Sequence, residues 1–375
     1  MKRILFLTGT RADFGKIKSL INILQQDIEF DVRIFITGMH MHALYGSTCK
    51  EVEMCGYKNI FKYINHTSEK TMDLTLARTI EGLSSYIKEF PVELIVVHGD
   101  RVEALAGAIV GSLNNILVAH VEGGELSGTI DDLIRHAVSK MSHIHFVCND
   151  QAKQRLIQLG ECKNAIFNIG SPDMDLMFSE NLPDIQEVKR YYEIPFDQYA
   201  IVMYHPVTTE YNMIEEHVEN LVSALLADDH HYVVIYPNND LGSNYILRPY
   251  RRFFGNSRFR IFPSIRFEYF LTLLKFSDFL IGNSSAGIRE APVYGIPSID
   301  IGTRQKNRAS ATSIINCGET RGNILKAIQK VGQVETECSN QFGNGNSNEL
   351  FYKILKTDEL WKLSKQKEFN DILMC

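Results

Sequence analysis

Short apolar runs that alternate with segments of helical spacing constrain the fold of this chain more than any other feature. In the first half, the runs that have the length and composition of buried strands are residues 4–7, 31–37, 94–98, 116–121 and 144–147. The segments with helical spacing are residues 16–24, 74–88, 103–113, 131–140 and 151–159. Strands that alternate with helices in this way predict a parallel sheet with helices on both faces.

The same alternation starts again after a turn-rich segment near residue 171. Its strand-like runs are residues 199–204, 232–236, 258–262, 279–281 and 297–301, and its helical segments are 214–227, 267–275, 286–291, 323–331 and much of 349–373. A chain of 375 residues is long enough to bury two cores. We therefore predict two α/β domains, residues 1–170 and 171–359, with a ligand cleft between them. The C-terminal helix, residues 360–375, is expected to pack back on the first domain.

Composition excludes several classes of function. The formal net charge of -6 and the isoelectric point near 6.1 argue against a nucleic-acid-binding protein, which is usually basic. Seven widely spaced cysteines without a C-x-x-C pattern favour reduced thiols over a disulfide framework or a zinc site. No apolar run approaches a membrane span, and no targeting segment is evident, so we expect a cytoplasmic protein.

The stretch from residue 97 to 136 holds most of the candidate catalytic residues. Two apolar runs end there in Gly-Asp-Arg and Glu-Gly-Gly, and such endings present chemistry at the carboxyl edge of a parallel sheet. His98 precedes Asp100, and His120 precedes Glu122, each by two residues along a predicted strand. Each pair is compatible with metal ligands, with core histidines beside structural carboxylates, or with acids that converge on one site together with Asp131. We favour the third interpretation.

Turns after other strands carry the candidate anion-binding residues. Arg11 and Lys16 lie near a predicted helix N-terminus, where amide donors favour an anion, although an ordinary turn with solvated charges fits equally. Arg135 follows Asp131 by four residues, so it pairs with that acid or holds a phosphate.

In the second half, His205 follows a strand and is either a phosphate partner or acid, or a structural histidine. Ser284 and Ser285 occupy a strand-to-helix turn and suit either a diphosphate or a plain N-cap. Glu290, about one and a half turns into the predicted helix, could accept both ribose hydroxyls, and Arg304 lies in a further glycine-containing turn.

These residues belong to motifs that follow one another in a fixed order over most of the chain. The motifs are GTRADFGK (9–16), TGMH (37–40), HGDR (98–101), EGGELSGTIDD (122–132), HPVTT (205–209), YPNND (236–240), GNSS (282–285), RE (289–290) and GTRQ (302–305). In this respect the chain resembles the hydrolysing UDP-N-acetylglucosamine 2-epimerases of bacterial sialic-acid synthesis and the epimerase domain of the bifunctional animal enzyme. The resemblance implies the glycosyltransferase-B architecture, in which two Rossmann-like domains surround a cleft.

The resemblance also implies roles for individual residues. The implied catalytic residues are Asp100, Glu122, Asp131 and His205. The implied UDP-binding residues are Arg11, Lys16, Arg101, Asn238, Ser284, Ser285, Glu290 and Arg304. The implied sugar-binding residues are His40, Arg135 and Arg289. The resemblance implies neither a metal nor a cofactor. It implies a homodimer or a homotetramer.

The implied reaction eliminates UDP from UDP-N-acetylglucosamine, giving 2-acetamidoglucal, and then adds water to release N-acetylmannosamine. The C2 proton is removable only as the anomeric bond breaks and positive charge grows at the ring, so several carboxylates are needed. The alternatives are the same reaction on a UDP-2,4-diacetamido-trideoxy sugar, a non-hydrolysing epimerase, a glycosyltransferase on the same fold, and a protein that binds the nucleotide-sugar without turnover.

Overall fold

The chain forms two compact α/β units. The computed structural model describes residues 1–65, 71–127, 130–238, 240–306, 308, 311–368 and 370–371. Gly128 and Thr129 of the 122–132 motif and Asn239 of the 236–240 motif lie outside the described residues. Unit 1 consists of Met1–Glu125, Asp131–Glu180 and Gln341–Cys375, and unit 2 consists of Leu126–Ile130 and Asn181–Asn340.

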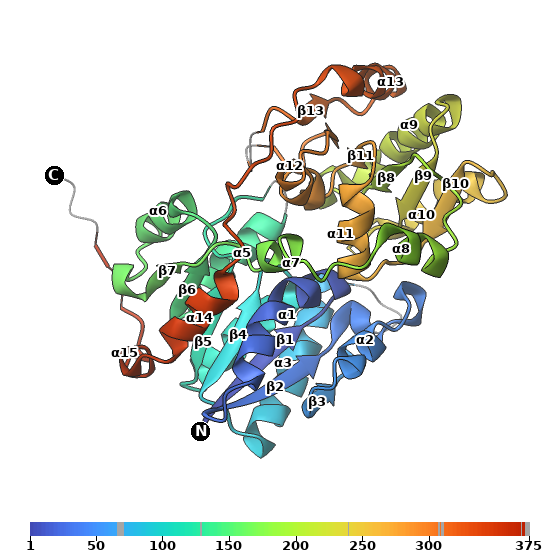
Figure 1. Cartoon of the computed structure of the whole chain (residues 1–375). Helices are drawn as coiled ribbons and strands as arrows, with labels where there is room; N and C mark the ends of the chain where they lie inside the picture. Colours follow the sequence, from blue (N-terminus) through green and yellow to red (C-terminus); the bar gives the residue numbers. More distant parts are fainter. Residues whose placement is uncertain are drawn as a thin grey trace. The chain divides into compact units, whose positions relative to one another are not determined.

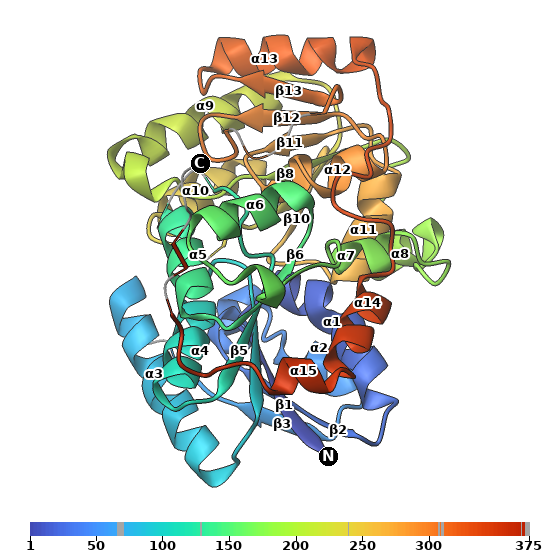
Figure 2. The ribbon, with the colours of Figure 1, turned by 90° about the vertical axis from the view of Figure 1, so that its left-hand side faces the viewer.

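Unit 1 is built on a seven-stranded parallel sheet with the order β3-β2-β1-β4-β5-β6-β7 (Figure 1). Its strands are β1 (Lys2–Thr8), β2 (Phe30–Ile36), β3 (Asn59–Lys62), β4 (Leu94–His98), β5 (Leu117–Val121), β6 (Ile144–Val147) and β7 (Ile166–Asn168). Its main helices are α1 (Arg11–Gln25), α2 (Cys49–Met54), α3 (Met72–Glu89), α4 (Val102–Leu113), α5 (Ile130–Met141), α6 (Asp150–Gln158), α7 (Asp173–Met177), α14 (Ser347–Leu355) and α15 (Asp358–Trp361). Figure 2 shows α3 and α4 on one face of this sheet and α1 and α14 on the other.

Local sequence explains where the helix nearest to the first strand begins. Thr10 caps α1 by accepting a hydrogen bond from the Asp13 N–H, and the Asp13 carboxylate accepts from the Thr10 N–H in return. Such a capping box satisfies two N–H groups that the first turn would otherwise leave without partners. The cap fixes the turn between β1 and α1 at the carboxyl edge of the sheet.

The C-terminal segment returns to unit 1 earlier than predicted. The return begins at Gln341, not at residue 360, because Phe351, Leu355 and Leu360 are buried in the core of unit 1. Burial of each such side chain contributes about 2 kcal/mol to the stability of the fold. The helical character predicted for residues 349–373 is limited to α14 and α15, and the described residues after Trp361 form no helix.

Unit 2 has a six-stranded parallel sheet with the order β10-β9-β8-β11-β12-β13. Its strands are β8 (Ala200–Met203), β9 (Tyr232–Ile235), β10 (Phe259–Phe262), β11 (Leu280–Gly282), β12 (Ser298–Ile301) and β13 (Ile314–Cys317). Its helices are α8 (Ile185–Tyr191), α9 (Ile214–Ala227), α10 (Ser243–Tyr250), α11 (Phe267–Lys275), α12 (Glu290–Val293) and α13 (Arg321–Lys330). Helix α9 packs beside α10 and α13, and α11 packs beside α8 and α12.

The strands that the sequence did not predict are β3, β7 and β13, and each lies at the edge of its sheet. Edge strands are less apolar because they are less covered: most residues of β3 are exposed, and no residue of β13 is fully buried. The predicted central runs match observed strands closely. No helix in the described part of the chain is both long and apolar enough to cross a membrane.

Candidate active site

Glu122 lies at the centre of a charged cluster at the carboxyl edge of the unit 1 sheet. Its side chain follows β5 and the residue is only 3% exposed. The Ser171 hydroxyl donates to Oε1 at 2.5 Å, and His98 Nε2 lies 3.3 Å from Oε2. Lys16 Nζ lies 3.9 Å from Oε1. A buried carboxylate with a hydroxyl, an imidazole and an ammonium group around it is a suitable acid–base group.

The backbone of Glu122 has an unusual conformation. Its φ angle is +64°, in the left-handed region that L-residues with long side chains seldom adopt. Such a conformation costs about 1–2 kcal/mol. The surroundings hold it: the Glu122 N–H donates to the Phe146 carbonyl at 2.9 Å, and Arg135 Nη1 donates to the Glu122 carbonyl. Strain of this kind is typical of functional sites, because the position that the side chain must take there outweighs the energetic cost of an unfavourable backbone conformation.

Arg135 connects two of the predicted catalytic acids. It lies on α5, is 2% exposed, and donates through Nη2 to Asp100 Oδ2 as well as to the Glu122 carbonyl. Asp100 follows Gly99, whose φ of +70° turns the chain after β4. Asp131 lies in the first turn of α5 and is partly exposed. The structure thus brings Asp100, Glu122 and Arg135 together on one edge of unit 1.

The predicted pairing of each histidine with the acid two residues later is wrong in its geometry. Strands β4 and β5 end at His98 and Val121, so the two-residue alternation does not extend to Asp100 or Glu122. The contact crosses between strands instead, from His98 to Glu122. His120 is fully buried between the Ser139 hydroxyl and the Gly99 carbonyl, and burial lowers its pKa to about 3. His120 is therefore a neutral core histidine.

Three of the cations predicted to bind UDP lie in unit 1. Arg11 Nη2 pairs with Glu51, and its Nε and Nη1 are buried without a hydrogen-bond partner among the described residues. Arg101 Nε donates to Glu103 at 3.3 Å. Lys16 is only 8% exposed, and its Nζ lies 3.0 Å from Asp173 Oδ2. Lys16 is therefore directed toward buried acids of its own unit.

His40, predicted to contact the sugar, is also fully buried. Its Nε2 lies 3.0 Å from the Thr8 hydroxyl and its Nδ1 lies 2.7 Å from the Thr48 hydroxyl. Burial lowers the pKa of His40 to about 4, so the ring is neutral at pH 7. In this structure both ring nitrogens stabilise the turn after β2, and neither lies open to solvent.

In unit 2, the candidate site begins with a hydrogen-bonded group around His205, which follows β8. The Asn283 side chain accepts from the His205 N–H at 2.7 Å and donates to the His205 carbonyl at 2.9 Å. The Asn238 N–H donates to His205 Nδ1 at 3.0 Å. In a neutral ring, this contact places the imidazole proton on Nε2. His205, Asn238 and Asn283 thus lie together at the carboxyl edge of the unit 2 sheet.

The predicted diphosphate turn follows β11. Ser284 caps the 3-10 helix Ser285–Gly287, and its hydroxyl accepts from the Ala286 N–H at 3.3 Å. Arg304 Nη1 donates to the Asn283 carbonyl at 3.3 Å, which ties the 302–305 turn to this one. Glu290 is the first residue of the four-residue helix α12 and not one and a half turns into a long helix, because the chain between β11 and α12 forms the 3-10 turn. Arg289 and Glu290 are both 2% exposed.

Sequence reasoning missed Asn283, Ser171 and Asp173 as parts of these sites. Asn283 has a direct signal, since it follows a strand within the GNSS motif. By sequence alone, Ser171 and Asp173 indicate a domain boundary, because a Ser-Pro-Asp sequence is typical of a turn. Only the folded chain brings these two residues to Glu122 and Lys16.

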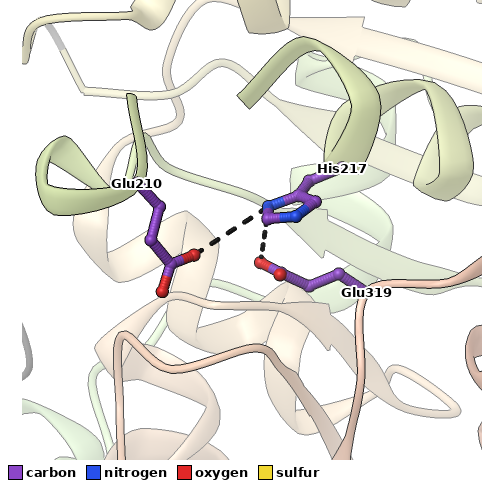
Figure 3. A group of neighbouring side chains, drawn as sticks. All are labelled: Glu210, His217 and Glu319. Carbon is purple, nitrogen blue, oxygen red and sulfur yellow. Dashed lines mark ion pairs between the residues drawn. The ribbon is translucent and has the colours of Figure 1, made fainter. Parts of the chain in front are cut away.

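Among the described residues, Glu210, His217 and Glu319 form the one group whose donor atoms lie close enough together to hold a metal ion (Figure 3). His217 Nδ1 lies 3.0 Å from Glu319 Oε1 and 3.9 Å from Glu210 Oε2. The Tyr204 hydroxyl also donates to Glu319, and the Thr303 hydroxyl to Glu210. Burial, together with the charge of Glu210, raises the pKa of Glu319. Pairing of His217 with two carboxylates accounts for this arrangement without an ion.

The fold and the carboxyl edges of the two sheets define an α/β enzyme with two Rossmann-like units. The edge in unit 1 carries buried groups suited to acid–base chemistry, and the edge in unit 2 carries hydroxyl, amide and guanidinium donors. The model of the UDP-N-acetylglucosamine 2-epimerase family matches residues 22–356. The chain is 46% identical to a UDP-N-acetylglucosamine 2-epimerase of Neisseria meningitidis serogroup B, over 99% of this chain and 100% of that protein. The chain belongs to the UDP-N-acetylglucosamine 2-epimerase family.

Two further comparisons bear on fold and specificity. The chain is 32% identical to a UDP-N,N'-diacetylbacillosamine 2-epimerase (hydrolyzing) of Legionella pneumophila, over 95% of this chain and 96% of that protein. A solved structure of a Neisseria meningitidis UDP-GlcNAc 2-epimerase bound to UDP-GlcNAc covers 94% of this chain and 99% of its own, with a TM-score of 0.81 at 18% identity. This likeness confirms the predicted fold class, two Rossmann-like α/β domains as in the glycosyltransferase-B architecture.

Proposed function

We propose that the protein is a hydrolysing UDP-N-acetylglucosamine 2-epimerase that converts UDP-N-acetylglucosamine and water into UDP and N-acetylmannosamine, a precursor for sialic-acid synthesis. The observation that carries the proposal is the buried, strained Glu122 within reach of His98, Lys16 and Ser171. The 46% identical relative is named for action on this substrate, and the 32% identical relative is named as hydrolysing.

In the proposed first step, the C1–O bond to UDP breaks and the C2 proton passes to a carboxylate. Glu122 and Asp100 are the groups that we assign to this elimination. Glu122 has the geometry of a general base, and Asp100 adds negative charge while positive charge grows at C1. Positive charges at Arg11 and Arg101 favour the departing diphosphate. The product of this step is 2-acetamidoglucal.

In the proposed second step, water adds across the C1–C2 double bond. The hydroxyl group goes to C1 and the proton goes to C2 from the other face, which gives N-acetylmannosamine. A second acid–base group is needed because the two faces of the ring are served in turn. We assign Asp131 to this step, since it lies partly exposed in the first turn of α5, near Arg135 in sequence.

Unit 2 supplies the groups that we propose to bind UDP. The hydroxyls of Ser284 and Ser285 and the guanidinium of Arg304 suit the diphosphate, and the Glu290 carboxylate suits the ribose hydroxyls. His205 is proposed to donate to the leaving phosphate from Nε2, because its Nδ1 already accepts from Asn238. The resemblance also supports a homodimer or homotetramer as the working unit.

A proton NMR time course with UDP-N-acetylglucosamine in D₂O tests the proposal. The expected result is free N-acetylmannosamine with deuterium at C2, together with UDP. Release of UDP-N-acetylmannosamine would show a non-hydrolysing epimerase. Turnover of UDP-N,N'-diacetylbacillosamine in place of UDP-N-acetylglucosamine would show that the sugar preference is that named for the Legionella relative.

A further inference from the structure

The buried acid Asp173 is not used in the reaction described above. It is the first residue of α7 and is 0% exposed. Lys16 Nζ lies 3.0 Å from Asp173 Oδ2 and 3.9 Å from Glu122 Oε1. Lys16 is itself 8% exposed. A single buried ammonium group thus lies between two buried carboxylates within unit 1.

This arrangement bears on how strongly Glu122 holds a proton. A buried lysine beside a carboxylate favours its ionised form and makes it a weaker base. A second carboxylate on the same lysine offsets part of that positive charge. With Asp173 in place, Glu122 therefore binds a proton more strongly than it would beside Lys16 alone.

The other groups that face Glu122 come from different elements. His98 at the end of β4 approaches Oε2, and Ser171, just before α7, donates to Oε1. Arg135 on α5 holds the main-chain carbonyl of Glu122 and pairs with Asp100. Substitution of Asp173 or Lys16 alters none of these groups chemically, so the contribution of this pair can be measured separately.

We propose that Asp173 is a positioning residue that acts through Lys16 to hold the Glu122 carboxylate in place and to keep it basic enough to accept the C2 proton. The inference rests on the proposed function. It assigns to Lys16 the role of an electrostatic link between the two acids. A purely structural ion pair would stabilise the fold but would leave the pH dependence of turnover unchanged.

The pH profile of kcat tests this role, because its acid limb reports protonation of the base in the enzyme–substrate complex. Asp173→Asn removes negative charge, so the acid limb should move to lower pH by roughly one unit. Lys16→Met removes positive charge, so the limb should move to higher pH by roughly one unit. The opposite directions distinguish an electrostatic role from general damage to the fold.

Matched controls come from the same helices. Asp175→Asn changes another acid of α7, which is partly buried and accepts from the Ser347 and Asn348 N–H groups. Lys18→Met changes another lysine of α1. Both should leave the acid limb where it is. Lys16→Arg keeps the charge and should also keep the wild-type limb. If Asp173→Asn does not fold, Asp173→Ser, which removes the same negative charge, takes its place beside Lys16→Met and Lys16→Arg.

Acid limbs that do not move, or that move in the same direction in Asp173→Asn and Lys16→Met, overturn the role of Asp173 while the proposed function stands. A wild-type protein that releases no N-acetylmannosamine overturns both. Calorimetric titration with UDP accompanies each variant, and unchanged UDP affinity shows that the nucleotide site is intact.

Discussion

The carboxyl edges of the two sheets differ in how their polar groups are held. In unit 1 the groups are ionic and mostly buried: Glu122 contacts Lys16, and Arg135 contacts the partly buried Asp100. In unit 2 the groups around His205 are mostly neutral, with Asn283 bonded to its backbone on both sides and Asn238 bonded to its ring. The same type of sheet thus presents two different chemistries at its edge.

The difference has an energetic reason. Burial of an ionised group costs several kcal/mol unless it is paired and fixed in position, so a buried ionic cluster is retained where charge itself is needed. Transfer of a proton from carbon needs such a charge, placed in advance. Binding of a nucleotide needs directed donors and acceptors, which amides, hydroxyls and helix ends supply at lower cost. The comparison therefore supports the proposal that the proton-transfer groups lie mainly in unit 1 and that most of the nucleotide-binding groups lie in unit 2.

The largest expected effect is on turnover, from a change in unit 1. Glu122→Gln keeps the shape of the side chain but removes the base, so kcat should fall on the order of 10³-fold. UDP affinity, measured by calorimetry, should stay within about threefold, because no charge of the proposed UDP-binding groups changes. Glu125→Gln, three residues away, is the control and should lower kcat far less. Loss of UDP binding in Glu122→Gln would show that this acid is structural and would break the comparison.

The next effect is on binding, from a change in unit 2. Arg304→Gln removes a guanidinium from the proposed diphosphate turn and should weaken UDP binding by roughly 10- to 100-fold, the range for a hydrogen bond to a charged group. At saturating substrate, kcat should change much less. Arg258→Gln, which alters an arginine of unit 2 that donates to the Leu226 carbonyl, should leave UDP binding as it is. A larger fall in kcat than in affinity would place Arg304 in the chemical step instead.

The third prediction concerns stability and two buried histidines of unit 1, His40 and His120. Burial lowers the pKa of His40 to about 4 and that of His120 to about 3, whereas an unfolded chain protonates histidine near pH 6.5. Below pH 6.5 the unfolded state therefore binds more protons than the folded state. The free energy of unfolding should fall as the pH falls from about 6.5 toward 4, by about 1.4 kcal/mol per pH unit for each histidine.

Urea denaturation between pH 7.5 and 5 measures this slope. His40→Gln should reduce the slope of the free energy of unfolding against pH by the contribution of one histidine, whatever its effect on stability at pH 7.5. His136→Gln changes an exposed histidine of α5 and should leave the slope as it is. An unchanged slope in His40→Gln would show that the ring is accessible to protons in the folded protein.

The sequence by itself determined the two α/β units, their central strands and the motifs at the strand ends, because hydrophobic periodicity and turn residues are local properties of the chain. It did not predict the edge strands β3, β7 and β13, whose exposed or short segments lack that signal. It also predicted that the C-terminal segment packs on unit 1 only from residue 360, since the burial of Phe351 depends on a surface of unit 1 formed by residues distant in the chain.

Within the candidate site, the sequence determined that Asp100 and Glu122 follow neighbouring strands. Only the tertiary structure decided which groups they meet. The left-handed backbone at Gly99 and Glu122 ends the alternation of side chains along β4 and β5. His98 therefore faces Glu122, which follows the neighbouring strand β5, and not Asp100, which follows its own strand β4. Lys16 and Asp173 are far apart in the chain, and their pairing beside Glu122 follows from how α1 and α7 pack. Contacts of this kind depend on where whole elements lie, which no local pattern of residues encodes.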